Sequence, residues 1–138
     1  MFNRIMAPVD LAHVERLGNA LDCAADLAKH YGVPITYVGV TSSAPSKLAH
    51  NPEEFSQKLD AFAQGEATKH GIKTSAHTAI AHDPAAEIDD ALMNAISETD
   101  ADLVVMASHV PNIMGYIWPS NGGKLAEHAK CSIMLVRA

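Results

Sequence analysis

The sequence lacks long hydrophobic runs. Its longest uninterrupted apolar stretches, residues 103–107 and 133–136, have the length of a strand, whereas a helix that spans a bilayer needs roughly 20 apolar residues. The first ten residues lack the apolar stretch of a secretion signal, because Pro8 and Asp10 close the run early. Both absences argue against a membrane as a partner and predict a cytoplasmic protein.

Cysteine and basic residues are also scarce. The only two cysteines stand far apart, Cys23 within an expected helix and Cys131 directly before an expected strand. This predicts buried thiols rather than a disulfide scaffold. Ten basic residues stand against sixteen acidic ones, so the net charge is -6, and the basic residues form no cluster. Nucleic-acid backbones are bound through such clusters, so the composition argues against nucleic acid as a partner.

What the chain does contain is enough apolar residues for one core. Its 138 residues, 48% of them hydrophobic, predict one domain over residues 1–138. Short aliphatic runs alternate with segments whose apolar residues recur every three or four positions, a pattern typical of strands alternating with helices. The expected strands are 5–9, 34–41, 72–80, 103–107 and 132–136, and the expected helices are 13–30, 52–70, 84–96 and 125–129.

Several of these elements have recognisable ends. Asn51 and Asp83 each precede a proline, which predicts an N-cap followed by proline in the first helical position. Gly32 and Gly71 are the expected stop signals of the first two helices. Between residues 72 and 80, one set of side chains alternates with another: Ile72, Thr74, Ala76, Thr78 and Ile80 with Lys73, Ser75, His77 and Ala79. This period of two is typical of a half-exposed edge strand.

Strict alternation of strands and helices predicts an α/β fold: a doubly wound, five-stranded parallel sheet with helices on both faces. In such a sheet, ligands bind beyond the carboxyl ends of the strands, where the strand order reverses. For five strand–helix units, this places the candidate site after the first and fourth strands, at residues 8–10 and 107–121.

Asp10 follows the first strand and has two interpretations. Its carboxylate could accept a hydrogen bond from a ribose hydroxyl or help to hold a metal on a polyphosphate. It could equally cap the helix that follows. The two roles are compatible.

The segment after the fourth strand is the most unusual part of the sequence. Ser120, Asn121 and two glycines precede a helix, and free backbone N–H groups at such a position bind anions. The alternative is an ordinary N-cap with flexible glycines. Residues 114–118 form an apolar patch within this segment. The patch is expected to belong to the local core, and the alternatives are a partner surface or a lid over the site.

His109 directly follows the fourth strand and could donate a hydrogen bond to a phosphate. No serine or cysteine nucleophile with a partner carboxylate is identifiable near it, so no catalytic residue is predicted. The other histidines show no metal-ligand spacing and are expected mostly on the surface. They are His13, His30, His50, His70, His77, His82 and His128.

The two ends of the chain resemble the universal stress protein family. The residues that carry the resemblance are 4–10, 107–109, 120–121 and 128–137. The resemblance is close over the last third of the chain and loose between residues 42 and 83. It implies an adenine-nucleotide alpha hydrolase-like fold, a cytoplasmic homodimer, and an ATP-binding stress-response module that contacts a further, unknown protein.

The resemblance also implies a set of residues that hold the cofactor, ATP with or without Mg²⁺. Asp10 matches the acidic residue near the ribose and phosphates, and Val40 matches the position that contacts adenine. Met106 matches the end of the fourth strand, and Ser120 matches the phosphate-binding hydroxyl. The expected contact residues are Pro8, Asp10, Val40, Met106, Ala107, His109, Val110, Ser120 and Asn121.

The glycine signature of the nucleotide-binding members is incomplete in this chain. Ala107 and Val110 stand where that signature has glycine, and Pro119 replaces the glycine before Ser120. A Cβ at Val110 would crowd a phosphate, and Pro119 lacks an N–H donor. Ala107 is normal in a branch of small members that still bind nucleotide.

These departures favour an alternative reading, a universal stress protein that has lost nucleotide binding and acts through protein–protein contacts. As an enzyme, the chain is expected to show at most slow ATP hydrolysis or autophosphorylation.

Overall fold

The computed structural model describes residues 1–108 and 121–137, whose strands form a five-stranded sheet. The strand order is β3-β2-β1-β4-β5, and every neighbouring pair is parallel. The strands are β1 (Ile5–Pro8), β2 (Ile35–Thr41), β3 (Thr74–Ile80), β4 (Leu103–Ala107) and β5 (Ser132–Val136).

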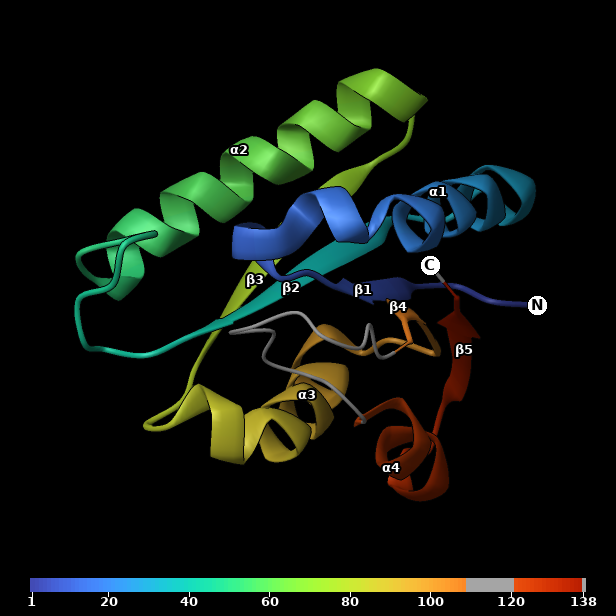
Figure 1. Cartoon of the computed structure of the whole chain (residues 1–138). Helices are drawn as coiled ribbons and strands as arrows, with labels where there is room; N and C mark the ends of the chain where they lie inside the picture. The colour runs from blue at the N-terminus through green and yellow to red at the C-terminus, as the bar shows by residue number, and fades with distance from the viewer. Residues whose placement is uncertain (109–120, 138) are drawn as a thin grey trace.

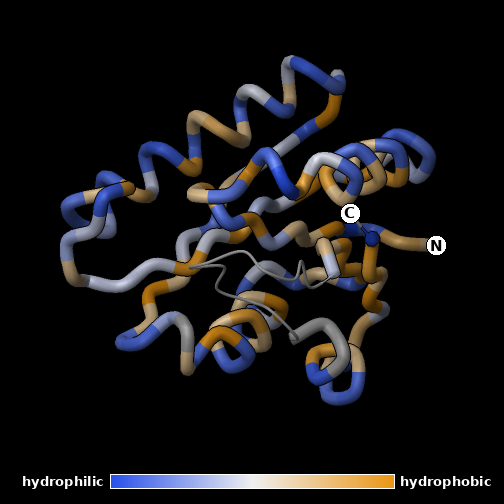
Figure 2. Tube along the Cα trace, in the orientation of Figure 1, coloured by the Kyte–Doolittle hydropathy of each residue, from blue (hydrophilic) through white to orange (hydrophobic). Residues whose placement is uncertain are grey.

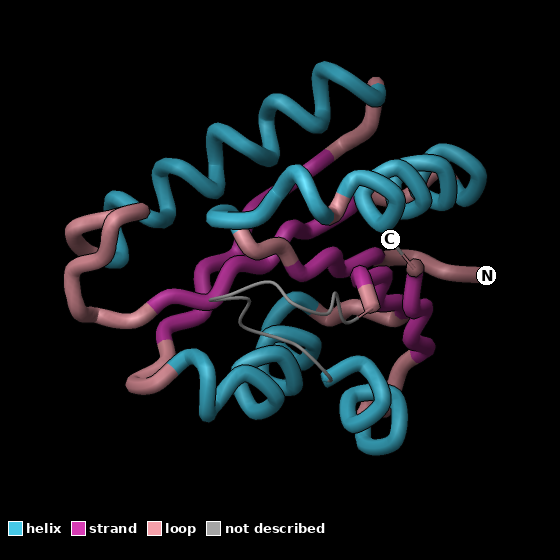
Figure 3. Tube along the Cα trace, viewed as in Figure 1, coloured by secondary structure: helices cyan, strands magenta, loops and turns pink. Residues whose placement is uncertain are grey.

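Helices cover both faces of this sheet (Figures 1 and 3). On one face lie α1 (Gly18–Tyr31) and α2 (Pro52–His70), and on the other lie α3 (Pro84–Thr99) and α4 (Asn121–His128). A 3₁₀ helix, η1 (Leu11–Arg16), joins β1 to α1. The predicted doubly wound α/β fold is therefore confirmed. Within residues 1–108 and 121–137, the helices are too short or too polar to cross a membrane.

The centre of the sheet is buried on both faces. Every residue of β1 and of β4 is buried, which explains why these strands are continuous apolar runs rather than alternating ones. Tyr37 of β2 is fully buried and meets Phe62 of α2 edge to face, with ring centroids 5.2 Å apart. Figure 2 shows the hydrophobic residues along the strands and the mixed character of the covering helices.

The strands β3 and β5 form the two edges of the sheet. The residues of β3 are half-buried or exposed, and Ile80 at its end is 63% exposed. The edge position predicted for this strand from its alternating pattern is therefore confirmed.

The expected helix ends are present. Gly32 and Gly71 follow α1 and α2 with a φ of +66°, a left-handed conformation that glycine adopts without the steric cost of a Cβ. At the start of α2, Asn51 Oδ1 accepts a hydrogen bond from the backbone N–H of Glu54, at 2.8 Å. The predicted N-cap of α2 and the glycine stops of α1 and α2 are therefore confirmed.

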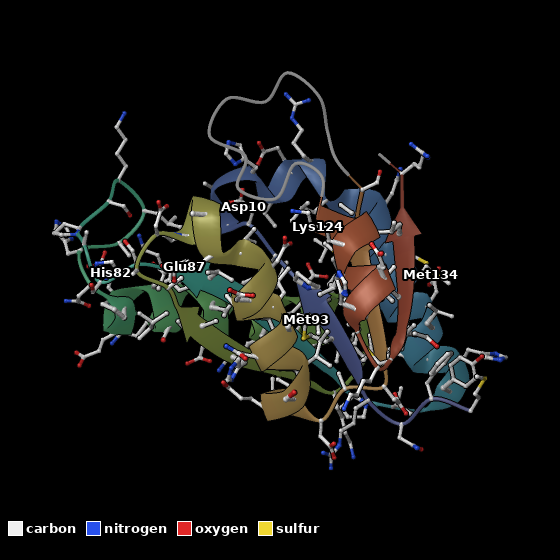
Figure 4. The ribbon with its side chains drawn as sticks, turned by 90° about the horizontal axis from the view of Figure 1, so that it is seen from below. Asp10, His82, Glu87, Met93, Lys124 and Met134 are labelled. Atoms are coloured by element: carbon white, nitrogen blue, oxygen red, sulfur yellow. The ribbon has the colours of Figure 1, made fainter. Side chains whose placement is uncertain are left out.

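The start of α3 is capped in a different way from the one expected. Asp83 is the N-cap residue and Pro84 follows it, but the capping carboxylate comes from Glu87. Its Oε1 accepts from the backbone N–H of Asp83 at 3.2 Å, and its Oε2 accepts from that of His82 at 3.3 Å. Figure 4 labels His82 and Glu87, which lie at this end of α3.

The expected starts of two helices are wrong. The first was predicted over 13–30, but α1 begins only at Gly18, because the preceding residues close the tighter turns of η1. The last was predicted over 125–129, but α4 already begins at Asn121. The glycines at positions 122 and 123 have low helix propensity, so the pattern placed the start of this helix too late.

The prediction that both cysteines are buried is also wrong. Cys23 and Cys131 are free and half-buried. Cys23 Sγ on α1 lies 3.6 Å from the Met134 sulfur on β5. This contact lies at the edge strand β5, where the Met134 side chain is partly exposed.

Gly39 of β2 allows α2 to approach the sheet closely. A Cβ at this position would lie 2.7 Å from the Phe55 ring, which is closer than packed carbon atoms tolerate. We therefore expect Gly39→Ala to lower the free energy of unfolding by about 1–3 kcal/mol through overpacking. Urea unfolding monitored by circular dichroism measures this change.

Gly65→Ala on α2 is the matched control, because the space around its Cβ position is open to 4 Å. Alanine favours a helix interior over glycine by about 0.5–1 kcal/mol, so this variant should be more stable than the wild type. Equal effects of the two substitutions would contradict the role assigned to the Gly39–Phe55 contact.

Candidate functional site

The strand order reverses between β1 and β4. From β1 the chain proceeds to β2 and then β3 on one side, and afterwards crosses to β4 and β5 on the other. In a doubly wound sheet, the crevice for ligands lies beyond the carboxyl ends of the strands at this reversal. The reversal therefore lies between the first and fourth strands, as the sequence predicted.

A pocket of about 290 Å³ opens at this carboxyl edge, which is near the lower end of the range of about 300–1,000 Å³ for small-molecule sites. Asp10 and Val40, two of the residues predicted to contact a ligand, share its lining. The lining comprises Val9, Asp10, Leu11, Ala12, Val40, Thr41, Ser42, Ser46, Lys47, Leu48, Phe55 and Pro84.

The pocket combines apolar surface with a few polar groups. Val40, Leu48 and Phe55 offer hydrophobic surface, which suits a flat ring. The Asp10 carboxylate accepts hydrogen bonds, and Lys47 carries a positive charge that can pair with an anion. Such a lining fits a ligand with an apolar ring, hydroxyl donors and a negative group.

Several of these lining residues were missed in the sequence. The Ser-, Ala- and Pro-rich composition of residues 42–51 is typical of a mobile surface loop, yet hydrogen bonds within the loop and from α2 hold it in place. Ser46 Oγ accepts from the backbone N–H of Leu48 at 3.2 Å, and Lys58 Nζ of α2 donates to the Leu48 carbonyl oxygen. The lone cation Lys47 among small polar residues was the only signal that could have marked this loop.

Asp10 is buried, with 6% of its surface exposed, and lies beside η1 (Figure 4). Its Oδ1 accepts a hydrogen bond from the backbone N–H of Ala12 at 3.1 Å, and its Oδ2 lies 2.9 Å from His13 Nδ1. Asp10 is the N-cap residue of η1, so the capping interpretation is confirmed. Its contact with a ligand stays a prediction.

The other predicted site residues belong to β1, to β4 and to the part of the chain that follows β4. Pro8 ends β1, and Met106 and Ala107 end β4, all three buried and outside the lining of the pocket. Asn121 is the first residue of α4. The predictions for His109, Val110, Pro119, Ser120 and the apolar patch 114–118 lie outside the described residues.

Of the seven histidines expected mostly on the surface, four are exposed and three are not. His13, His70 and His77 are half-buried, and a nitrogen of each ring lies close to a carboxylate oxygen. Beside the pairing of His13 with Asp10, His70 Nε2 lies 3.1 Å from Glu66 Oε2 and His77 Nε2 lies 2.8 Å from Glu98 Oε2.

These carboxylate–histidine pairs do not form a metal centre. Over residues 1–108 and 121–137, no three His, Cys, Asp or Glu side chains gather closely enough to hold a metal ion.

The sequence as a whole matches a known family. The model of the universal stress protein family matches residues 1–137. Universal stress protein G of Salmonella typhimurium strain LT2 is 26% identical to this chain over an alignment 148 residues long. The alignment covers 99% of this chain and 100% of that protein.

Solved structures of family members share the fold. The universal stress protein from Archaeoglobus fulgidus in complex with dAMP matches with a TM-score of 0.68 at 19% identity, over 96% of each chain. A universal stress protein in complex with cAMP matches with a TM-score of 0.69 at 18% identity, over 98% of this chain and 97% of that one. With the family model matching nearly its full length, this chain belongs to the universal stress protein family.

Proposed function

We propose that this chain binds an adenine nucleotide, ATP with or without Mg²⁺, at the carboxyl edge of β1, β2 and β4, and acts as a nucleotide-binding stress-response module. The observation that carries the proposal is that Asp10 and Val40, which are distant in sequence, line one pocket beside the strand reversal. The dAMP and cAMP complexes of two structural relatives support adenine nucleotides as the ligand class.

The lining of the pocket suggests how the nucleotide would be oriented. Val40 and Phe55 would pack against the adenine ring, and Asp10 would accept a hydrogen bond from the ribose. Ser120 and Asn121, which the family resemblance matches to the phosphate-binding residues, are the proposed donors to the phosphates. Mg²⁺ accompanying ATP would be held largely by the phosphates and water, as is usual for this ion.

Nucleotide binding should be visible as a gain in stability. Because ATP would bind the folded state only, a concentration of 100 times the Kd stabilises the protein by about 2.7 kcal/mol. We expect a saturable rise of several degrees in the melting temperature with ATP and MgCl₂, and a smaller rise with GTP. A flat response to every nucleotide at millimolar concentration would contradict the proposal and favour the alternative, a family member that acts through protein contacts alone.

Asp10→Asn tests the assignment of the site. Asparagine caps helices about as well as aspartate, so the fold should persist, whereas the loss of the negative acceptor should weaken ATP binding about tenfold, equivalent to 1.4 kcal/mol. Asp60→Asn, an exposed carboxylate of α2, is the matched control. Unchanged ATP affinity of the Asp10 variant in isothermal titration calorimetry would remove Asp10 from the site.

We also propose that the chain forms a homodimer through β5. This strand lies at the edge of the sheet, and Met134 and Leu135 on it are 38% and 43% exposed. Figure 4 shows Met134 at the rim of the molecule. An edge strand with exposed apolar side chains is a template for pairing with another strand, and a second copy of β5 would cover these side chains.

A lysine on β5 should disrupt this dimer, because charge on an edge strand opposes strand pairing. We expect light scattering coupled to a sizing column to give a dimer mass for the wild type and a monomer mass for Leu135→Lys. Ile80→Lys is the control, since Ile80 is exposed on the opposite edge. Dissociation by the Ile80 variant alone would place the interface at β3 instead.

The cytoplasm stays the proposed location of the protein. Its two cysteines are free and half-buried, which fits a reducing compartment in which disulfides rarely persist.

A further inference from the structure

Asp10 and His13 are joined by two contacts at the start of η1. The backbone N–H of His13 donates to the Asp10 carbonyl oxygen at 3.0 Å, and the His13 ring nitrogen Nδ1 lies 2.9 Å from Asp10 Oδ2. Because an ionised carboxylate can only accept, Nδ1 carries the hydrogen and donates it. The imidazole is therefore bonded to the same residue through its main chain and its side chain.

The backbone of η1 is shaped around this contact. His13 has φ -133° and ψ 32°, which interrupts the helical conformation within η1. The side chains of Asp10 and His13 retain only 7% and 21% of their accessible surface. A polar pair at this depth is held in one geometry, because each group has little water with which to replace its partner.

The hydrogen bonds to η1 leave Asp10 half of its hydrogen-bonding capacity. A carboxylate has about four acceptor sites, two on each oxygen. The Ala12 N–H occupies one on Oδ1 and His13 occupies one on Oδ2. Among residues 1–108 and 121–137, one site on each oxygen is left for a ligand in the pocket that Asp10 lines. The two adjacent hydroxyls of a ribose can both donate hydrogen bonds to such a carboxylate.

The torsion that sets the plane of an aspartate carboxylate has a broad energy minimum, so an aspartate bonded at one oxygen only would be free to turn. We propose that His13 is a positioning residue of the nucleotide site: by donating from Nδ1 to Oδ2, it fixes the plane in which Asp10 meets the ribose hydroxyls. This role rests on the proposed nucleotide binding, and it adds selectivity for a ligand that carries those hydroxyls.

A pair of substitutions of nearly equal shape separates this role from simple packing. His13→Asn keeps an N–H donor where Nδ1 stands, whereas His13→Leu fills a similar volume without a donor. Binding of ATP and of 2′,3′-dideoxy-ATP, which lacks both ribose hydroxyls, is measured by calorimetry for the two variants and the wild type. His30→Leu, an exposed position on α1, is the control for replacing a histidine.

We expect the wild type to bind ATP about tenfold more tightly than the dideoxy analogue, on the scale of one hydrogen bond to a charged group. His13→Leu should lose most of that preference while its affinity for the dideoxy analogue stays within about twofold of the wild type. His13→Asn should retain the preference. Melting curves without nucleotide show that each variant is folded.

Three results would overturn the positioning role while nucleotide binding stands. These are a His13→Leu variant that keeps the preference for ATP, an equal loss of both nucleotides in that variant, and a His13→Asn variant that behaves as His13→Leu does. If the wild type binds neither nucleotide, the proposed function itself fails, and the role of His13 fails with it.

Discussion

The central strand β1 pairs with β2 on one side and with β4 on the other, and this pairing decides where a ligand can reach the sheet. Both β1 and β4 are completely buried, so helices must cover each face to keep their apolar residues from water. Val9 and Asp10 follow β1, Val40 and Thr41 end β2, and all four residues line the pocket at the carboxyl ends of these strands. The pocket therefore opens where the covered strands end.

The carboxyl ends of the strands, where the pocket opens, depend on one close contact between α2 and β2. Gly39 allows the Phe55 ring to lie directly against β2, which brings the first turn of α2 over the end of that strand. Phe55 and the folded loop after β2 then supply one side of the pocket. Packing and site formation are thus two consequences of the same small residue.

Asp10 shows how a residue can be structural and still be available to a ligand. It caps η1 and bonds His13, yet a carboxylate has more acceptor sites than these two donors occupy. Burial of the pair gives the carboxylate one orientation. An aspartate in this position need not lose its structural bonds in order to bind a hydroxyl.

The sequence by itself determined the types and order of the elements, because short-range physics governs them: apolar periodicity, the asparagine cap of α2, and the left-handed glycines after α1 and α2. It also placed Asp10 near the reversal, and the family resemblance added Val40. Local patterns misplaced the starts of α1 and α4, and they did not show which histidines are half-buried, since burial depends on tertiary neighbours. Only the tertiary structure brought Val40, Phe55 and Asp10 into one pocket, because strand order and helix packing join residues that no local pattern connects.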